Sequence, residues 1–417
     1  MSSAFSNALA GLTANNQAIN IVSTNLANMG TSGYKEQQVS FQELVNESAG
    51  GFSTTGGVSG SVVTTSMQQF TQGTLQTTGN PYDAAIQGGG FFVVDTAAGQ
   101  QLYTRQGDFD VDSTGHLVTA NGEFVQGWNA LSGTLSTGGA TSDIVLPTNL
   151  VLQPSASTQF TVSANLNANA VVGSAAGTFS SPIKVFDAQG VSHTLTVTYT
   201  ETAADTWSYN VTIPAGDLSA ASTTTNPLAT GSLTFDGNGN LLTPAASSGT
   251  IPIAITGLAS GASDMSLNWN LYVNGTPTLT QYNQTSANTA SSQDGVGAGQ
   301  LSSMSIGPDG YVVAEFSNGT SQNVAQIALA SVLNPDSMQQ VLGNSFATTG
   351  ATAAPVIGTP NTGARGQITG GSLETSTVDI ATEFTNLLQY ERGYQANSKV
   401  ISTEDQVVQA TISLITA

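Results

Sequence analysis

The two ends of this 417-residue chain carry helical apolar spacing, whereas almost everything between them has the pattern of β-strands and turns. From Phe5, alternating steps of four and three residues reach five apolar positions of seven, and from Ile380 the same steps reach eight of eleven. We therefore predict an amphipathic helix at each end, each with a narrow, coiled-coil-like apolar stripe. The stripe residues are Phe5, Leu9, Leu12, Ile19 and Leu26 at the N-terminus and Ile380, Phe384, Leu387, Tyr394, Ile401, Val408, Ile412 and Ile415 at the C-terminus.

The N-terminal segment is an intrinsically weak helix. It has no charged side chain before Lys35, and Asn, Ser, Thr, Gln, Ala and Gly fill most positions outside the stripe. Asn, Ser and Thr compete for backbone hydrogen bonds, and Gly11 costs about 1 kcal/mol relative to alanine in a helix. One interpretation is that the two helices simply cover a globular core. We favour a second, in which they become ordered on each other and on further copies of the chain, so that the stripe residues form the subunit interface.

The charge balance excludes several classes of function. Against 26 acidic residues stand only six basic ones, scattered along the sequence, for a formal charge of −20. This pattern argues against a nucleic-acid partner and against binding to an anionic membrane surface. The absence of cysteine excludes disulfides and thiolate chemistry. The sequence has no run of 18 apolar residues, so it does not predict a transmembrane helix. The first residues also lack the pattern of a cleavable secretory signal.

Strand and turn signals fill the middle of the chain. Residues 88–118 and 305–319 have the pattern of hairpin strands and look like two halves of one β-domain, interrupted by a further β-rich block. The predicted fold class is α+β, mainly β, with paired terminal helices and nested β-rich inner and outer domains. The expected parts are a terminal helical assembly domain (1–30 with 375–417), a linking segment (31–73 with 361–374), an inner β-domain (74–147 with 291–360) and an inserted outer β-domain (148–290).

Residues suited to catalysis or metal binding are sparse. Asp108, Asp110 and Asp112 resemble the start of a calcium loop, but Ser113 stands where glycine is needed, and the aspartate and asparagines of 236–240 fail in the same way. We interpret both as hairpin turns. The two histidines, at positions 116 and 193, have no partner at metal-ligand spacing in the sequence, and no Gly-x-Ser-x-Gly motif occurs. We therefore expect no enzyme activity, catalytic residue, cofactor or metal site.

Several motifs resemble those of one family, the bacterial flagellar rod and hook proteins. Residues 25–35 are similar to the motif that ends the N-terminal helix of that family, and residues 389–401 are similar to its C-terminal helix motif. Segments 90–92, 103–109, 121–122, 310–311 and 364–376 match its inner β-domain and the exit into the C-terminal helix. The resemblance covers about 1–130 and 300–417. It leaves the central insertion unmatched, apart from being the kind of outer domain that hook proteins carry.

Within this family, the length of the chain favours the hook member, because rod members are much shorter and lack so large a β-insertion. The distal rod protein of the basal body is the alternative. A distant alternative from another class is a secreted β-rich adhesin whose helices merely trimerise it, which would need a secretion signal or an anchor.

The resemblance implies a structural subunit that polymerises into a curved, flexible tube and transmits torque from rod to filament. It implies further copies of the chain, the distal rod protein, the hook cap and the hook-filament junction proteins as partners. It also implies passage through the flagellar type III export apparatus to an extracellular place in the flagellum. The export-gate motif of the family, Phe-x-x-x-Phe, corresponds to Phe41 and Val45, where the second position departs from the pattern.

Overall fold

The computed structural model describes residues 3–44, 61–130 and 134–416. The chain forms two compact units, which we describe separately. Unit 1 comprises residues 1–148, 303–314 and 321–417, and unit 2 comprises residues 149–302 and 315–320.

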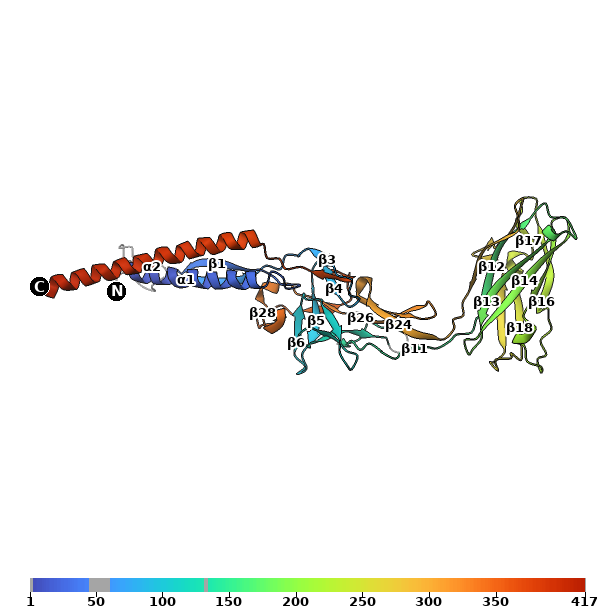
Figure 1. Ribbon diagram of the computed structural model, residues 1–417, viewed down its shortest axis with the longest axis horizontal. Coiled ribbons are helices and arrows are strands. Elements are labelled where there is room, and N and C mark those ends of the chain that lie inside the picture. Colours follow the sequence, from blue (N-terminus) through green and yellow to red (C-terminus); the bar gives the residue numbers. More distant parts are fainter. Residues whose placement is uncertain (1–2, 45–60, 131–133, 417) are drawn as a thin grey trace. The chain divides into compact units, whose positions relative to one another are not determined.

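Two long helices begin and end unit 1, as the sequence predicts. Helix α1 spans Ser3–Ala27 and helix α2 spans Ile380–Thr416. Helix α2 begins where Asp379 Oδ1 accepts the backbone N–H of Thr382 at 2.8 Å, an N-terminal cap. The helices pack side by side (Figure 1). With β-strands elsewhere, this arrangement confirms the predicted fold class.

An antiparallel pair of strands, β1 (Gln37–Leu44) and β2 (Ser61–Gln68), lies against α1. This pair occupies the part of the sequence that we expected to link helix and sheet. The ring of Phe41 on β1 lies 5.8 Å from that of Tyr390 on α2, so the pair also reaches the second helix.

The remaining strands of unit 1 form the larger part of a 14-stranded sheet and two short pairs. Apart from β11, the main path of the sheet is β24-β25-β26-β9-β5-β6-β29-β28, of which β24 and β25 belong to unit 1 over residues 303–306 and 311–314. Strand β3 pairs with β32 and β4 with β31. These strands are β3 (Leu75–Thr77), β4 (Ala84–Gln87), β5 (Phe91–Asp95), β6 (Gln101–Thr104), β7 (Phe109–Val111), β8 (Leu117–Thr119), β9 (Phe124–Asn129), β10 (Ser142–Asp143), β24 (Gly299–Ile306), β25 (Tyr311–Phe316), β26 (Ser321–Ile327), β27 (Leu329–Ser331), β28 (Gln339–Gln340), β29 (Ser345–Ala347), β30 (Val356–Gly358), β31 (Gln367–Gly370) and β32 (Ser372–Glu374).

The sheet of unit 1 brings together residues from both halves of the sequence. Strand β5 pairs with β6 and β9 from the first half and with β27 from the second. The rings of Phe70, Phe91 and Phe346 contact one another edge to face, at centroid distances of 5.3 to 6.0 Å. The nested organisation inferred from the hairpin signals therefore reflects strand pairing within one sheet.

Unit 2 contains two five-stranded sheets that share one apolar core. Its strands alternate buried and exposed residues, as in β14, so one face of each sheet is apolar. Trp207, Trp269, Tyr199 and Phe160 are fully buried between the sheets. The strands are β11 (Val151–Leu152), β12 (Gln159–Asn167), β13 (Thr178–Phe186), β14 (Ser192–Ala203), β15 (Thr206–Thr212), β16 (Ala229–Phe235), β17 (Leu241–Thr243), β18 (Thr250–Ile255), β19 (Met265–Asn270), β20 (Tyr272–Val273), β21 (Thr276–Pro277), β22 (Leu279–Tyr282) and β23 (Ala287–Gln293).

Both calcium-like aspartate motifs are turns, as expected. Asp112 Oδ1 accepts the backbone N–H groups of Thr114 and His116, each at 2.8 Å. Asp236 Oδ1 likewise accepts the N–H groups of Asn238 and Asn240. In both turns the carboxylate stabilises the backbone of the hairpin.

Candidate assembly interface

Helices α1 and α2 run antiparallel and approach each other closely. A Cβ atom on Gly11 would lie 2.8 Å from Asn397 Nδ2, and one on Gly393 would lie 2.6 Å from Asn15 Oδ1. These two pairs are reciprocal, because each helix presents a glycine to an asparagine of the other. Residue numbers rise along α1 as they fall along α2, which defines the antiparallel register.

The two closest approaches between the helices are made by glycine and asparagine, Gly11 with Asn397 and Gly393 with Asn15. On α1 the buried residues are Ala8, Ala14, Ala18, Ile21, Val22 and Asn25, and on α2 the most buried side chain is that of Glu383. The predicted apolar stripe coincides only in part with this face. Phe384 and Tyr394 follow Glu383 and Gly393 by one residue, about 100° around the helix, and are exposed. Leu387 and Ile401 lie four residues after Glu383 and Asn397, on nearly the same side as the contact, and are partly buried.

The predicted stripe residues consequently differ in exposure. Leu9, Ile380, Phe384, Tyr394, Val408 and Ile412 are exposed, with Phe384 at 53% and Ile412 at 56%. Phe5, Leu12, Ile19, Leu26, Leu387 and Ile401 are partly buried along the edge of the helix pair, and the side chain of Ile415 lies outside the described part. Leu388, Val400 and Val407 add exposed apolar surface to α2. Of the two export-gate positions, Phe41 is exposed on β1 and Val45 lies outside the described residues.

A buried ion cluster joins the helical end of unit 1 to its strands. Lys35 Nζ lies 2.7 Å from Glu374 Oε1, and Arg105 Nη1 lies 3.4 Å from Glu374 Oε2. The side chains of Lys35 and Glu374 are fully buried and that of Arg105 is 5% exposed. Gly73 N–H donates to the same carboxylate at 2.7 Å. Segments far apart in the sequence thus meet at one charged group.

Burial dominates the electrostatics of this cluster. It lowers the pKa of the Lys35 ammonium and of the Arg105 guanidinium, while the Glu374 carboxylate opposes both shifts. The Arg105 guanidinium also lies 5.3 Å from the centre of the Phe91 ring. Gly33 packs against the Arg105 backbone at φ +65, with a Cβ position only 2.6 Å from the Arg105 carbonyl, so only glycine fits there.

Sequence reasoning missed this cluster, because it noted Lys35 and Arg105 only as basic residues scattered along the sequence. A signal was present: the three members fall in three separate motifs, at 25–35, 103–109 and 364–376. Their meeting depends on pairings such as β3 with β32, which no local pattern reveals.

A second polar cluster lies at the junction between the end of α1 and the start of β1. Glu383 is 2% exposed, and the side chains of Glu36, Asn25 and Asn386 influence the pKa of its carboxyl group. Burial, followed by the charge of Glu36, raises the pKa of Glu383 to about 7. Burial also raises the pKa of Tyr34 to about 12, with smaller effects from the two glutamates.

Asn25 holds this junction together. Its side chain accepts the backbone N–H of Gln37 at 3.0 Å and donates to the Gln37 carbonyl at 2.8 Å, as another strand would. The Tyr34 hydroxyl donates to the same Asn25 oxygen at 3.1 Å. The end of α1 and the start of β1 are therefore locked in one orientation.

The rest of the described chain offers little chemistry. In unit 2, His193 is buried beside Asp187 at 3.2 Å and Asp217 at 3.3 Å. Among the described residues, no group of three or more His, Asp or Glu side chains is arranged to hold a metal ion. Neither α1 nor α2, as far as they are described, is long and apolar enough to span a bilayer.

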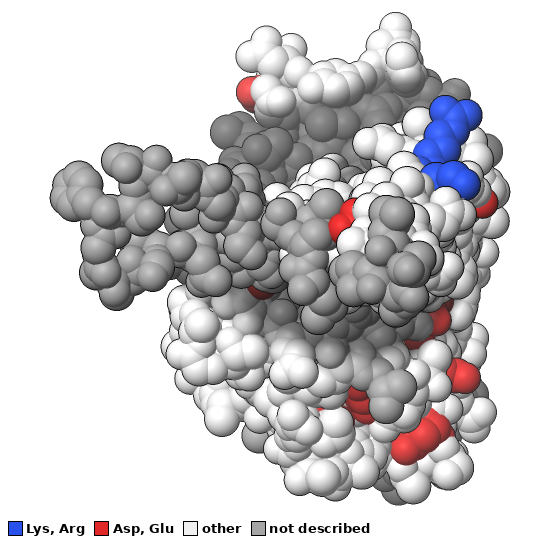
Figure 2. Space-filling view, turned by 90° about the vertical axis from the view of Figure 1, so that its left-hand side faces the viewer, with Lys and Arg blue, Asp and Glu red and all other residues white. Residues whose placement is uncertain are grey.

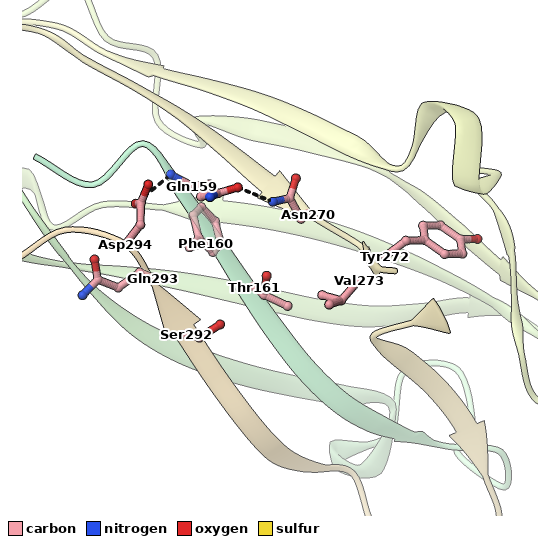
Figure 3. Close-up of a pocket in the computed structure, with 9 residues that line it drawn as sticks. All are labelled: Gln159, Phe160, Thr161, Asn270, Tyr272, Val273, Ser292, Gln293 and Asp294. Atoms are coloured by element: carbon pink, nitrogen blue, oxygen red, sulfur yellow. Dashed lines mark hydrogen bonds between the residues drawn. The ribbon is translucent and has the colours of Figure 1, made fainter. Parts of the chain in front are cut away.

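A shallow hollow of about 380 Å³ lies beside β12 in unit 2 (Figure 3). Its polar groups already bind one another. Asp294 accepts the backbone N–H groups of Thr158 and Gln159, and Gln159 accepts the Asn270 amide. The hollow therefore presents no free carboxylate for chemistry, and the helical end of unit 1 remains the candidate site.

Comparison with known proteins places the whole chain in one class. Its sequence matches four families: "Flagella basal body rod protein" over residues 5–35, "Flagellar hook protein FlgE/F/G D1 domain" over 85–170, "Flagellar basal body protein FlaE D2 domain" over 163–296 and "Flagellar basal body rod FlgEFG protein C-terminal" over 369–414. The class is thus that of the flagellar rod and hook proteins.

Curated relatives narrow the class. The chain is 30% identical to the flagellar hook protein FlgE of Escherichia coli, across 99% of this chain and 100% of that protein. It is 31% identical to FlgE of Salmonella typhimurium, across 98% and 99%. A crystal structure of the Helicobacter pylori hook protein FlgE2 shares the fold with a TM-score of 0.51, at 14% identity, covering 72% of this chain and 99% of that one. The chain belongs to the flagellar hook protein FlgE family.

Family membership confirms the functional expectation. The chain is a structural, non-enzymatic subunit of the hook and a component of the flagellum. The distal rod and adhesin alternatives are not favoured, because hook proteins match the full length of the chain. The family match at 163–296 also accounts for the insertion that no motif identified.

Proposed function

We propose that copies of this chain polymerise through their helical ends into a curved, flexible tube that transmits torque from rod to filament. The observation that carries this proposal is the apolar stripe of α2, where Phe384 is about half exposed beside α1 and Val408 is about half exposed beyond the first residue of α1. Leaving such a row of side chains in water is unfavourable, at about 25 cal/mol per Å². Neighbouring copies would cover it.

The proposal divides labour between the parts of the chain. The helices supply cohesion through the thirteen stripe residues, and the β-rich parts form the wall of the tube, with the inserted domain outermost. Small polar side chains on the outer contacts allow neighbouring β-domains to slide as the tube rotates. Strand β23, whose residues Ala287, Ser291 and Ser292 are exposed, has this character.

The remaining partners and the export route belong to the same proposal. We infer contacts with the distal rod protein at one end of the tube, with the hook cap during assembly, and with the hook-filament junction proteins at the other end. Export would proceed through the flagellar type III apparatus. Exposure of Phe41 on β1 is compatible with recognition of the 41–45 segment by the export gate.

Electron microscopy of the purified full-length protein tests this function. We expect curved tubes with a central channel. Discrete trimers, or a protein that stays monomeric at all concentrations and salt conditions, would contradict it.

A further inference from the structure

Some basic residues of unit 1 have partners within the chain, and others do not. Lys35 and Arg105 are buried against Glu374. Arg365 donates to the Thr359 carbonyl at 3.0 Å and to the Thr362 hydroxyl at 2.6 Å. This leaves two basic side chains on the described surface of unit 1. Both are exposed and both lie on α2: Arg392 and Lys399.

Neither residue has an acidic residue three or four positions away on its own helix. Residues three and four positions away are the ones that form ion pairs along a helix. The residues at these positions around Arg392 are Leu388, Gln389, Gln395 and Ala396. Around Lys399 they are Gln395, Ala396, Ser402 and Thr403. The described residues include no ion pair to either side chain.

The two charges also point away from α1. They are seven residues apart, so they share one side of α2 at a separation of about 10.5 Å. That side lies roughly 130° around the helix from the glycine and asparagine residues that contact α1. Viewed from the helical end, the visible Lys and Arg side chains gather in a single patch (Figure 2).

We propose that Arg392 and Lys399 form a docking site for carboxylates of a second copy of this chain. The charge of −20 makes copies repel one another, and these two side chains are the exposed positive charges of unit 1. Because α1 carries no charged residue, the complementary carboxylates come from α2 or the strands of the neighbouring copy. Attraction at this site sets the register of copies that the apolar stripe alone would leave free to slide.

This inference rests on the proposed polymer and names one contact within it. Zero-length carbodiimide cross-linking tests it directly, because the reagent joins an amine only to a carboxylate in contact with it. The chain has three lysines, of which Lys35 is buried and Lys184 belongs to unit 2. In tubes assembled from mixed heavy- and light-isotope protein, we expect heavy–light peptide pairs that contain Lys399. Tubes without such pairs at Lys399 would overturn the inference.

Matched substitutions provide the second test. Lys399→Gln and Arg392→Gln should each raise the concentration needed for polymerisation about tenfold, a change of about 1.4 kcal/mol. Lys184→Gln also removes one positive charge, from an exposed position on β13, and should change the concentration needed for polymerisation less than twofold. Lys399→Arg should retain assembly.

The outcomes separate the inference from the function on which it rests. Equal effects of Lys184→Gln and Lys399→Gln would show a response to net charge alone and would overturn the docking site. Unchanged assembly of both α2 variants would overturn it as well, while leaving the polymer intact. A wild-type chain that never polymerises would remove the proposed function and the docking site together.

Discussion

At the residue scale, the Lys35–Glu374–Arg105 cluster depends on a single carboxylate that pairs with two buried cations. Two buried cations share one anion, so the cluster has an excess positive charge that only the protein can compensate. Backbone carbonyls do part of this work, since Lys35 donates to Thr71 and Arg105 to Gly88. Removing one member of a buried ion pair leaves an uncompensated charge and costs about 3–5 kcal/mol.

Substitutions in this cluster should therefore have unequal effects. Glu374→Gln leaves two buried cations without an anion, and we expect it to lower the free energy of unfolding of unit 1 by about 3–5 kcal/mol. Lys35→Met leaves the neutral pair of Arg105 and Glu374 and should cost clearly less. Urea denaturation of both variants, followed by circular dichroism, measures the difference. A larger loss for Lys35→Met would contradict this reading of the cluster.

Glu383 makes the helix junction sensitive to pH. Its pKa is about 7 in the folded chain and about 4.5 in a free glutamate, so the folded state holds the proton more tightly. The stabilising contribution of Glu383 is therefore fully present below about pH 4.5 and is lost as the pH rises through about 7. The groups facing Glu383 are Glu36, Asn25, Asn386, Tyr34 and Tyr390.

Glu383→Gln should remove this dependence. We expect the variant to unfold its helices at similar urea concentrations at pH 5 and pH 8, whereas the wild-type helices should unfold at clearly lower urea at pH 8. Far-ultraviolet circular dichroism follows the transition. Equal pH dependence in both proteins would assign the effect to another group.

At the scale of elements, each terminal helix uses two faces for two purposes. Where α1 and α2 approach most closely, the contact is made by glycine and asparagine, which permit close approach but bury little apolar area. The adjacent face carries the larger apolar side chains. A helix pair built this way is weakly held by its own contact, which agrees with helices that gain order from further copies.

Substitution on the exposed stripe should separate assembly from folding. Phe384→Asp and Val408→Asp place a charge where the side chain is about half exposed, so the monomer should fold normally. Polymerisation should be lost, because a charge buried between copies lacks a partner. Thr411→Asp, on an exposed position of α2 that lies outside the stripe and away from Arg392 and Lys399, is the control. Sedimentation of the three variants measures assembly, and tubes from the two stripe variants would contradict the proposed interface.

At the scale of the whole molecule, the strand-rich parts have cores of their own. Unit 2 is organised around buried Trp207 and Trp269, and unit 1 around the Phe70, Phe91 and Phe346 cluster, none of which involves α1 or α2. Folding of the β-structure is therefore expected to be independent of the helices.

Deletion of residues 380–417 tests this independence. We expect a soluble, β-rich monomer that melts like the β-structure of the full chain but no longer polymerises. The full-length protein, measured in parallel, is the control. Tubes formed by the truncated chain would show that the helices do not drive assembly.

Sequence and tertiary structure determined different things in this protein. Local sequence patterns predicted much of the structure. Helical spacing predicted α1 and α2, strand alternation predicted the mainly β middle, and turn residues predicted the turns at Asp112 and Asp236. The meeting of Lys35 with Arg105 and Glu374 required the strand pairings of unit 1, which join segments hundreds of residues apart. Only the tertiary structure decided which faces of the helices meet. The reason is physical: glycine and asparagine allow the closest approach of the two helix backbones, so these residues make the contact between α1 and α2. Much of the apolar stripe therefore remains exposed, where other copies can bind it.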